Sequence, residues 1–105
     1  MKAEKRLMNQ IRLYCGEQGW IVIRNNVGTF QLMDGRFMST GLPKGWPDLM
    51  ILTKKGKVIF VETKVGNNVA TKEQQRFLDL LTMAHFDAFV CYSIDSFILK
   101  TKKYI

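Results

Sequence analysis

Two short apolar segments, residues 49–52 and 58–61, flank the turn-forming sequence Lys54-Lys55-Gly56. Apolar runs of this length on either side of a glycine-containing turn predict a β-hairpin, and they restrict the chain to folds that contain a sheet. A three-residue loop ends on a residue with positive φ, which glycine adopts without steric cost. We therefore expect Gly56 to close a three-residue loop between two strands.

The register of this hairpin decides whether acidic side chains meet at its open end. With a three-residue loop, Asp48 lies directly opposite Glu62. A two-residue turn would instead place Asp48 opposite Thr63 and turn its side chain to the other face. Lys64 follows Glu62 by two residues, so both side chains leave the same face of the strand. The three-residue loop thus predicts two carboxylates and one ammonium group together.

Ionised carboxylates beside an apolar core require a cation. Lys64 can supply that charge, in which case the group is a salt bridge at the end of a strand. A divalent ion can also supply it, because carboxylate oxygens are hard ligands that suit Mg²⁺ or Mn²⁺. This spacing by itself leaves both interpretations open.

The composition predicts one folded domain over residues 1–105. Hydrophobic residues make up 47% of the chain, which disfavours a disordered protein. No apolar run approaches the roughly 20 residues of a membrane span, and residues 1–6 lack the apolar stretch of a signal peptide. Cys15 and Cys91 show no metal-ligand spacing. We expect reduced thiols in a cytoplasmic protein.

The chain is strongly basic, with a formal net charge of +7 and a pI near 9.7. Lysine and arginine release condensed counterions when they neutralise phosphates, so this charge favours a nucleic-acid partner. A basic protein without a specific partner is the alternative.

The remaining pattern alternates helices and strands. It predicts a helix over residues 3–16, a strand over 20–25, a hairpin over 29–38 around Asp34-Gly35, a helix over 71–85, a strand over 87–92, a short helix over 94–99 and a solvated basic tail over 100–103. The strand–helix–strand unit over residues 58–92 is expected to be a right-handed parallel crossover. The fold class is therefore α/β, a mixed sheet with helices on its faces.

Several residues near the predicted hairpin have two interpretations. Glu4 lies at the N-terminal end of the inward face of its helix, although glutamate in a first turn also suits the helix dipole. Thr71 and Gln74 form a capping box, which ties the Gln74 amide to the helix start. The glycines of the loop over residues 39–46 leave room for a backbone phosphate to approach.

These residues resemble the PD-(D/E)xK nuclease superfamily, and specifically its virus-type replication-repair nuclease (VRR-NUC) branch. The similarity extends from Glu4 to about Ser93. The matching positions are Glu4, Arg24-Asn25-Asn26-x-Gly28, Asp34-Gly35, Gly41-x-x-x-Gly45-x-Pro47-Asp48, Glu62-x-Lys64 and Thr71-x-x-Gln74. One departure is His85-Phe86, where the family often has glycine after the helix, so we expect this departure to affect the helix exit and not the metal site.

The resemblance implies a restriction-endonuclease-like fold, in which helices flank a mixed central sheet and a β-hairpin is inserted. It implies a Mg²⁺-dependent (or Mn²⁺-dependent) endodeoxyribonuclease of DNA repair, similar to Holliday-junction resolvases. The implied partner is branched DNA. Stand-alone relatives of this kind are often homodimers in phages and bacteria, which implies a bacterial or phage-infected cell.

The resemblance also assigns roles to the residues at the hairpin end. Asp48 and Glu62 would ligate the metal, together with the backbone carbonyl of Thr63. Lys64 would orient the attacking water or offset charge on the scissile phosphate. Gln74 would contact the water or the DNA backbone, and Glu4 would hold a water molecule beside the metal.

A second set of residues consists of candidate DNA contacts. It comprises Arg24, Asn25, Lys44 and Trp46, and the lysines Lys54, Lys55 and Lys57, for which a role as exposed solubilising groups is the alternative. Trp46 could stack on a base or pack across the site. The candidate dimer surface is the inserted hairpin, with Phe30, Leu32 and Phe37.

Two alternatives remain at this stage. One is a non-catalytic, basic nucleic-acid-binding module. The other is a nuclease with the same active site that acts on other DNA or RNA substrates. Metal-dependent cleavage separates the first from an enzyme, and a substrate panel separates the second.

Overall fold

A computed structural model describes residues 2–25 and 29–105, without the side chain of Phe30. Asn26 and Gly28 of the family pattern lie outside the described residues. The elements are α1 (Ala3–Gln18), β1 (Ile21–Arg24), β2 (Thr29–Gln31), β3 (Phe37–Ser39), β4 (Leu49–Leu52), β5 (Val58–Thr63), α2 (Lys72–Met83), β6 (Asp87–Cys91), α3 (Ile94–Thr101) and the 3-10 helix η1 (Lys102–Tyr104).

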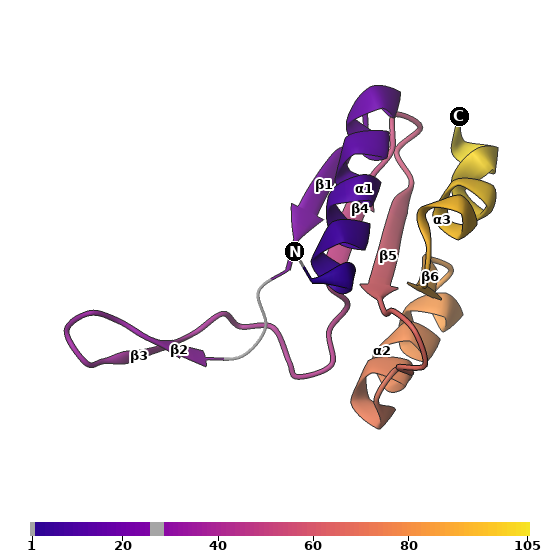
Figure 1. Cartoon of the computed structure of the whole chain (residues 1–105). Helices are drawn as coiled ribbons and strands as arrows, with labels where there is room; N and C mark the ends of the chain where they lie inside the picture. Colours follow the sequence, from indigo (N-terminus) through magenta and orange to yellow (C-terminus); the bar gives the residue numbers. More distant parts are fainter. Residues whose placement is uncertain (1, 26–28) are drawn as a thin grey trace.

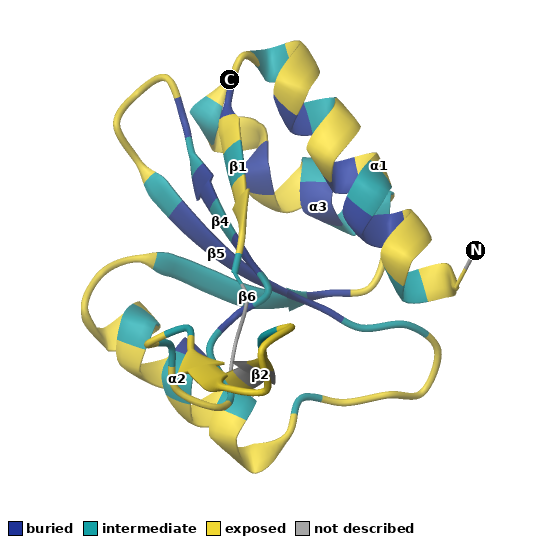
Figure 2. Cartoon of the chain, turned by 90° about the vertical axis from the view of Figure 1, so that its left-hand side faces the viewer, coloured by how far each residue is buried: buried dark blue, intermediate teal, exposed yellow. Residues whose placement is uncertain are grey.

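The centre of the molecule is a four-stranded mixed sheet with the order β1-β4-β5-β6. The β1–β4 and β4–β5 pairs are antiparallel, whereas β5 and β6 are parallel and joined through α2. Helices α1 and α3 lie against one face of the sheet, and α2 lies against the other (Figures 1 and 2). The predicted α/β class and element order are confirmed.

The β4–β5 hairpin has the predicted three-residue loop. Leu49 pairs with Val61 and Leu52 pairs with Val58, so the next pair at the open end is Asp48 and Glu62. Gly56 has φ of 74°, and its N–H donates to the Thr53 carbonyl at 3.2 Å. Any residue other than glycine at this position would need a left-handed backbone conformation, which is unfavourable for residues with a Cβ atom.

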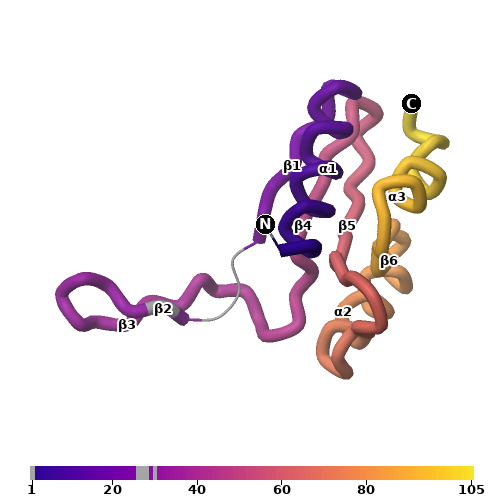
Figure 3. Tube along the Cα trace, viewed as in Figure 1, coloured from indigo at the N-terminus to yellow at the C-terminus, as the bar shows by residue number. Residues whose placement is uncertain are grey.

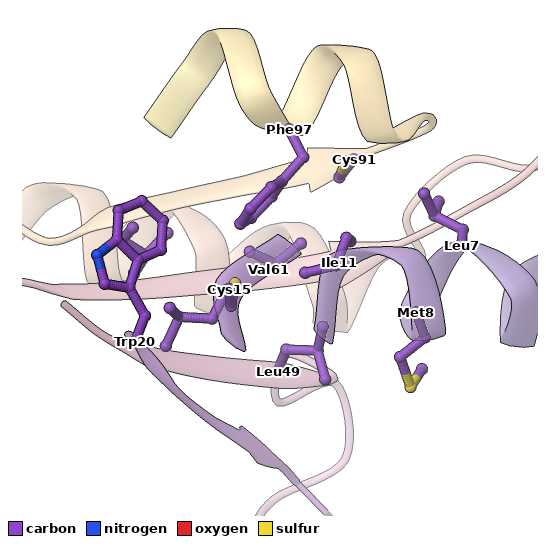
Figure 4. Packing of buried hydrophobic residues seen from close by; sticks show 11 residues of the cluster. Leu7, Met8, Ile11, Cys15, Trp20, Leu49, Val61, Cys91 and Phe97 are labelled. Atoms are coloured by element: carbon purple, nitrogen blue, oxygen red, sulfur yellow. The ribbon is translucent and has the colours of Figure 1, made fainter. Parts of the chain in front are cut away.

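Strand alternation divides the side chains between the two faces of the sheet. Leu49, Ile51, Ile59 and Val61 are fully buried beneath α1 and α3. Figure 4 shows this core, in which Phe97 of α3 and the apolar stripe of α1 meet the sheet. The stripe consists of Leu7, Met8, Ile11 and Cys15. The alternate residues of β5, including Glu62, point to the other face of the sheet, which α2 covers.

The C-terminal segment differs from its prediction as a solvated tail. Helix α3 continues to Thr101, which is fully buried and whose hydroxyl donates to the Phe97 carbonyl at 2.8 Å. Thr101 follows Phe97 by four residues, so both lie on the inward face of α3. The Tyr104 hydroxyl then donates to the Asp87 carboxylate. The lysine-rich composition predicted an exposed tail and gave no sign of these two contacts.

The ends of α1 and α2 lie close to their predicted positions. Helix α1 ends at Gln18, two residues beyond the predicted range of residues 3–16, and Gly19, with φ of 75°, is its C-cap. The capping box that begins α2 is present, because the Thr71 hydroxyl accepts from the Gln74 N–H while the Gln74 side chain accepts from the Thr71 N–H.

The predicted hairpin β2–β3 forms an arm that projects from the body of the molecule (Figures 1 and 3). Its register pairs Gln31 with Phe37, and its loop has three residues, closed by Gly35 with φ of 91°. Met33, Phe37 and Met38 are exposed on this arm. Across residues 2–25 and 29–105, no helix is both long and apolar enough to cross a membrane.

Candidate active site at the open end of the β4–β5 hairpin

Asp48 is held at the mouth of β4 by its neighbours on both sides. Its Oδ2 accepts from the Thr63 N–H at 3.0 Å and from the Thr63 hydroxyl at 2.8 Å. On the other side, the Asn25 N–H donates to the Asp48 carbonyl at 2.7 Å, and its side-chain amide donates to the Pro47 carbonyl at 2.9 Å. Strands β1 and β5 therefore orient this carboxylate together.

Glu62 is a buried carboxylate whose hydrogen-bonding capacity is only partly used. Only 2% of its surface is exposed. Its Oε2 accepts from the Gln74 amide at 3.3 Å and lies 4.0 Å from the Lys64 ammonium. Its Oε1 is buried and has no hydrogen-bond partner among the described residues. A buried oxygen of this kind is costly unless a cation or a proton satisfies it.

The surroundings raise the pKa of Glu62 to about 8. Burial is the largest cause, because it penalises the ionised form. Asp48 raises the pKa further, since a protonated Glu62 can donate a hydrogen bond to it and an ionised one is repelled. Lys64 lowers the pKa, and the charge of Glu4 raises it. One ammonium group therefore fails to offset the acidic surroundings.

Gln74 completes the capping box and also contacts Glu62, while its predicted contact with the water or the DNA backbone stays a prediction. Its Oε1 accepts from the Thr71 N–H at 2.8 Å, as the capping box requires. Its Nε2 is thereby directed to Glu62 Oε2. The helix cap positions the amide toward the site, because the two ends of one side chain serve separate partners.

Gly45 explains how α2 comes so close to this site. It has φ of 94°, and a Cβ atom built there would lie 2.7 Å from the backbone carbon of Glu73. The sequence suggested that this glycine leaves room for a phosphate, but the start of α2 occupies that space. Gly41, with nothing within 4 Å of a built Cβ, remains open.

The other predicted site residues differ in how far they are buried. Glu4 is partly buried in the first turn of α1, and its charge acts on Glu62. Arg24 is exposed at the end of β1, and Lys44 is exposed before Gly45. Trp46 packs edge-on against Phe60 and Phe77, with ring centroids 5.6 Å apart in each pair.

Packing is therefore the role that the structure shows for Trp46, and base stacking stays a prediction. The candidate phosphate contacts Lys54, Lys55 and Lys57 surround the β4–β5 loop, at the opposite end of the hairpin from Glu62.

The donor set at this centre fits a hard divalent cation. Two carboxylates face each other, and one of their oxygens has no hydrogen-bond partner in the part of the chain that the structure describes. Within the described ranges, no three His, Cys, Asp or Glu side chains converge as a metal-binding group. Backbone oxygen and water would therefore complete the coordination, as is usual for Mg²⁺.

Two positioning contacts were not predicted from the sequence. Asn25 is predicted as a DNA contact. In the structure, its side-chain amide and its N–H donate to the carbonyls of Pro47 and Asp48. Thr63 was considered for its carbonyl, yet its N–H and hydroxyl hold Asp48. A β-branched hydroxyl residue between the two charges of Glu62-x-Lys64 was the available signal for Thr63.

Comparison with known proteins agrees with this architecture. A model of the VRR-NUC domain family matches residues 34–95, more than half of the chain. This range includes Asp48, Glu62, Lys64 and Gln74, whereas Glu4 and Arg24 lie outside it. A solved structure described as a VRR_NUC domain has a TM-score of 0.71 at 22% identity, covering 99% of this chain and 98% of that chain. No curated protein matches.

Proposed function

Because the chain belongs to the VRR-NUC family, a family of nuclease domains, we propose that it cleaves DNA as a metal-dependent endonuclease. The observation that carries this proposal is the buried Glu62 carboxylate, which faces Asp48 while its Oε1 lacks a partner among the described residues. A strand-end salt bridge with Lys64 would leave that oxygen unsatisfied. A cation between the two carboxylates would satisfy it.

Asp48 and Glu62 would hold Mg²⁺ or Mn²⁺, together with the Thr63 carbonyl. The N–H and C=O of a strand residue leave the same edge of the strand, and the Thr63 N–H already points at Asp48. The bound ion would draw charge from the phosphodiester and acidify a water molecule.

Residues of the chain supply the remaining functions. Lys64 places a fixed positive charge beside Glu62, where it stabilises the negative charge that develops on the phosphate during attack. Gln74 fixes one oxygen of Glu62 and so directs the other toward the ion. Glu4 would orient a water molecule at the edge of the site.

The test is a cleavage assay with the purified protein on a duplex, a flap, a four-way junction and an RNA strand, each with Mg²⁺ or EDTA. We expect cleavage with Mg²⁺ only, and a loss on the order of 100-fold or more in Glu62→Gln. Lys102→Ala, an exposed substitution in η1, is the control and retains activity. DNA binding without cleavage would instead identify a non-catalytic binding module.

We further propose that the protein acts on branched DNA as a homodimer, in the manner of a Holliday-junction resolvase. Two sites related by a two-fold axis match the symmetry of a four-way junction. The projecting arm β2–β3 supports this proposal, because Phe37 and Met38 expose apolar surface far from the core. Leu32 is half-buried, and the side chain of Phe30 lies outside the described residues.

Sedimentation of wild type and Phe37→Asp at micromolar concentration tests the dimer. We expect a dimer that dissociates in Phe37→Asp and persists in Met83→Asp, an exposed site on α2. Cleavage of opposed strands should then become single-strand nicking. A monomeric wild-type protein would refute the dimer and leave the nuclease proposal intact.

A further inference from the structure

A pocket outside the carboxylate centre is lined mainly by cations from two elements. Lys2, Glu4, Lys5 and Met8 contribute from the start of α1, and Arg24 contributes from the end of β1. The pocket encloses about 300 Å³ and opens to solvent. Met8 is buried, whereas the three basic side chains are exposed at the rim. These side chains are therefore accessible to a ligand.

The positive charge of this pocket is not neutralised. Lys2, Lys5 and Arg24 form no ion pair with any carboxylate in the part of the chain that the structure describes. Elsewhere, Arg36 pairs with Asp34 and Lys103 pairs with Asp87. Glu4 lines the same pocket, so three cations meet one carboxylate. Anions are the ligands that such a surplus attracts.

The pocket adjoins the candidate active site through the backbone. Arg24 pairs with Leu49, the residue after Asp48. The next residue, Asn25, donates hydrogen bonds to the carbonyls of Pro47 and Asp48. Glu4 lines the pocket and lies close enough for its charge to act on Glu62. A nucleic-acid strand that enters the carboxylate centre would therefore pass this pocket.

We propose that Lys2, Lys5 and Arg24 bind a backbone phosphate of the DNA, separate from the phosphate that is cleaved. This inference rests on the proposed function, since it assumes a nucleic-acid substrate at the neighbouring centre. The contact is independent of base sequence, because the pocket offers charge to phosphate oxygens. Its role is to fix the substrate strand relative to Asp48 and Glu62.

The chain provides a control of equal charge. Arg12 of α1, Lys100 of α3 and Lys102 of η1 are exposed basic residues that do not line the pocket. Replacing all three by alanine removes the same charge as the pocket variant Lys2→Ala/Lys5→Ala/Arg24→Ala. Both sets are exposed, so melting temperatures should confirm that both variants fold.

The experiment measures the affinity for a short DNA duplex by fluorescence anisotropy in EDTA, across a series of NaCl concentrations. For the pocket variant we expect weaker binding and a log–log salt slope reduced by about 0.9, the value for one lost phosphate contact. The control variant Arg12→Ala/Lys100→Ala/Lys102→Ala should keep the wild-type slope. With Mg²⁺, the pocket variant should show a raised KM.

Equal slopes for wild type and the pocket variant would overturn the inference, as would equal losses in the pocket and control variants. A wild-type protein that binds no DNA would overturn it as well. If wild type binds DNA without cleaving it, while the slope falls only in the pocket variant, the phosphate pocket stands and the nuclease proposal fails.

Discussion

Glu62 is a residue whose charge opposes the stability of the fold around it. It is nearly fully buried beside Asp48, and its pKa rises to about 8 because ionisation there is unfavourable. Such a group suits a site that gains a cation after folding, since the ion then stabilises the arrangement that folding alone leaves strained.

Glu62→Gln should therefore stabilise the metal-free protein. The folded pKa lies above the ordinary value of 4.5, so the stabilising contribution of the protonated form is complete below that pH and is lost as pH rises through about 8. In EDTA, wild type should lose stability between these values, whereas the variant should not. At pH 8 to 9 we expect a difference on the order of 2 kcal/mol in urea unfolding. An unchanged or lower stability of the variant would contradict this account.

His85 occupies a backbone conformation that favours glycine. Its φ is 72°, and it follows the C-cap Ala84 of α2. The Phe86 N–H donates to the Leu81 carbonyl and the His85 N–H donates to the Thr82 carbonyl, both at 3.0 Å, which is the Schellman pattern. The departure from the family pattern lies at this helix exit, as expected.

We expect His85→Gly to raise the free energy of unfolding by about 0.5–1 kcal/mol, because glycine removes the left-handed penalty. Thermal unfolding measures the effect. His85→Ala is the control, since it changes the side chain but keeps the penalty and should give no gain. A destabilised glycine variant would show that the imidazole makes a compensating contact.

At the scale of elements, the start of α2 connects helix stability to the candidate active site. Thr71 caps the helix, Gln74 completes the capping box and touches Glu62, and Gly45 permits the close approach of the neighbouring loop. Loss of the Gln74 side chain therefore affects both the helix cap and the carboxylate centre.

Thr71→Ala should lower stability by about 1 kcal/mol through the lost cap. It leaves the Thr71 N–H in place, so Gln74 keeps its own capping contact and cleavage should fall little. Gln74→Ala removes the cap contact and the Glu62 contact together, and we expect lower stability with a larger loss of cleavage. Denaturant unfolding and turnover distinguish the two variants. Equal cleavage in both would restrict Gln74 to capping.

At the scale of the whole molecule, the C-terminal segment closes the fold against β6. Desolvation alone would raise the pKa of Asp87, but hydrogen bonds from Tyr104 and Lys103 and the charge of Lys103 outweigh it and lower that pKa. Burial and Asp87 raise the pKa of Tyr104 to about 12. The contact thus joins the last residues to the sheet.

Tyr104→Phe should reduce stability at pH 7 by about 1 kcal/mol or less. The contribution of Asp87 is present above its ordinary pKa of 3.8 and is lost as pH falls through the lowered value. The difference between wild type and variant should therefore shrink as the pH falls below 3.8, as measured by urea unfolding. A difference that is constant with pH would assign the effect to packing alone.

Local interactions made much of this fold predictable. The glycine of the β4–β5 loop determines the register that places Asp48 opposite Glu62, and the spacing of Thr71 and Gln74 determines a cap. Both depend on residues within one turn or hairpin, where backbone geometry leaves few options. The order of helices and strands followed from apolar periodicity for the same reason.

Contacts between distant segments depended on the assembled sheet. The bracing of Asp48 by Asn25, the approach of α2 to Gly45 and the docking of Tyr104 on Asp87 join residues with no local spacing rule. The unpartnered oxygen of Glu62 likewise results from burial by several elements at once. Periodicity reports which side of an element faces inward, whereas the neighbours of that side are set only when the elements pack together.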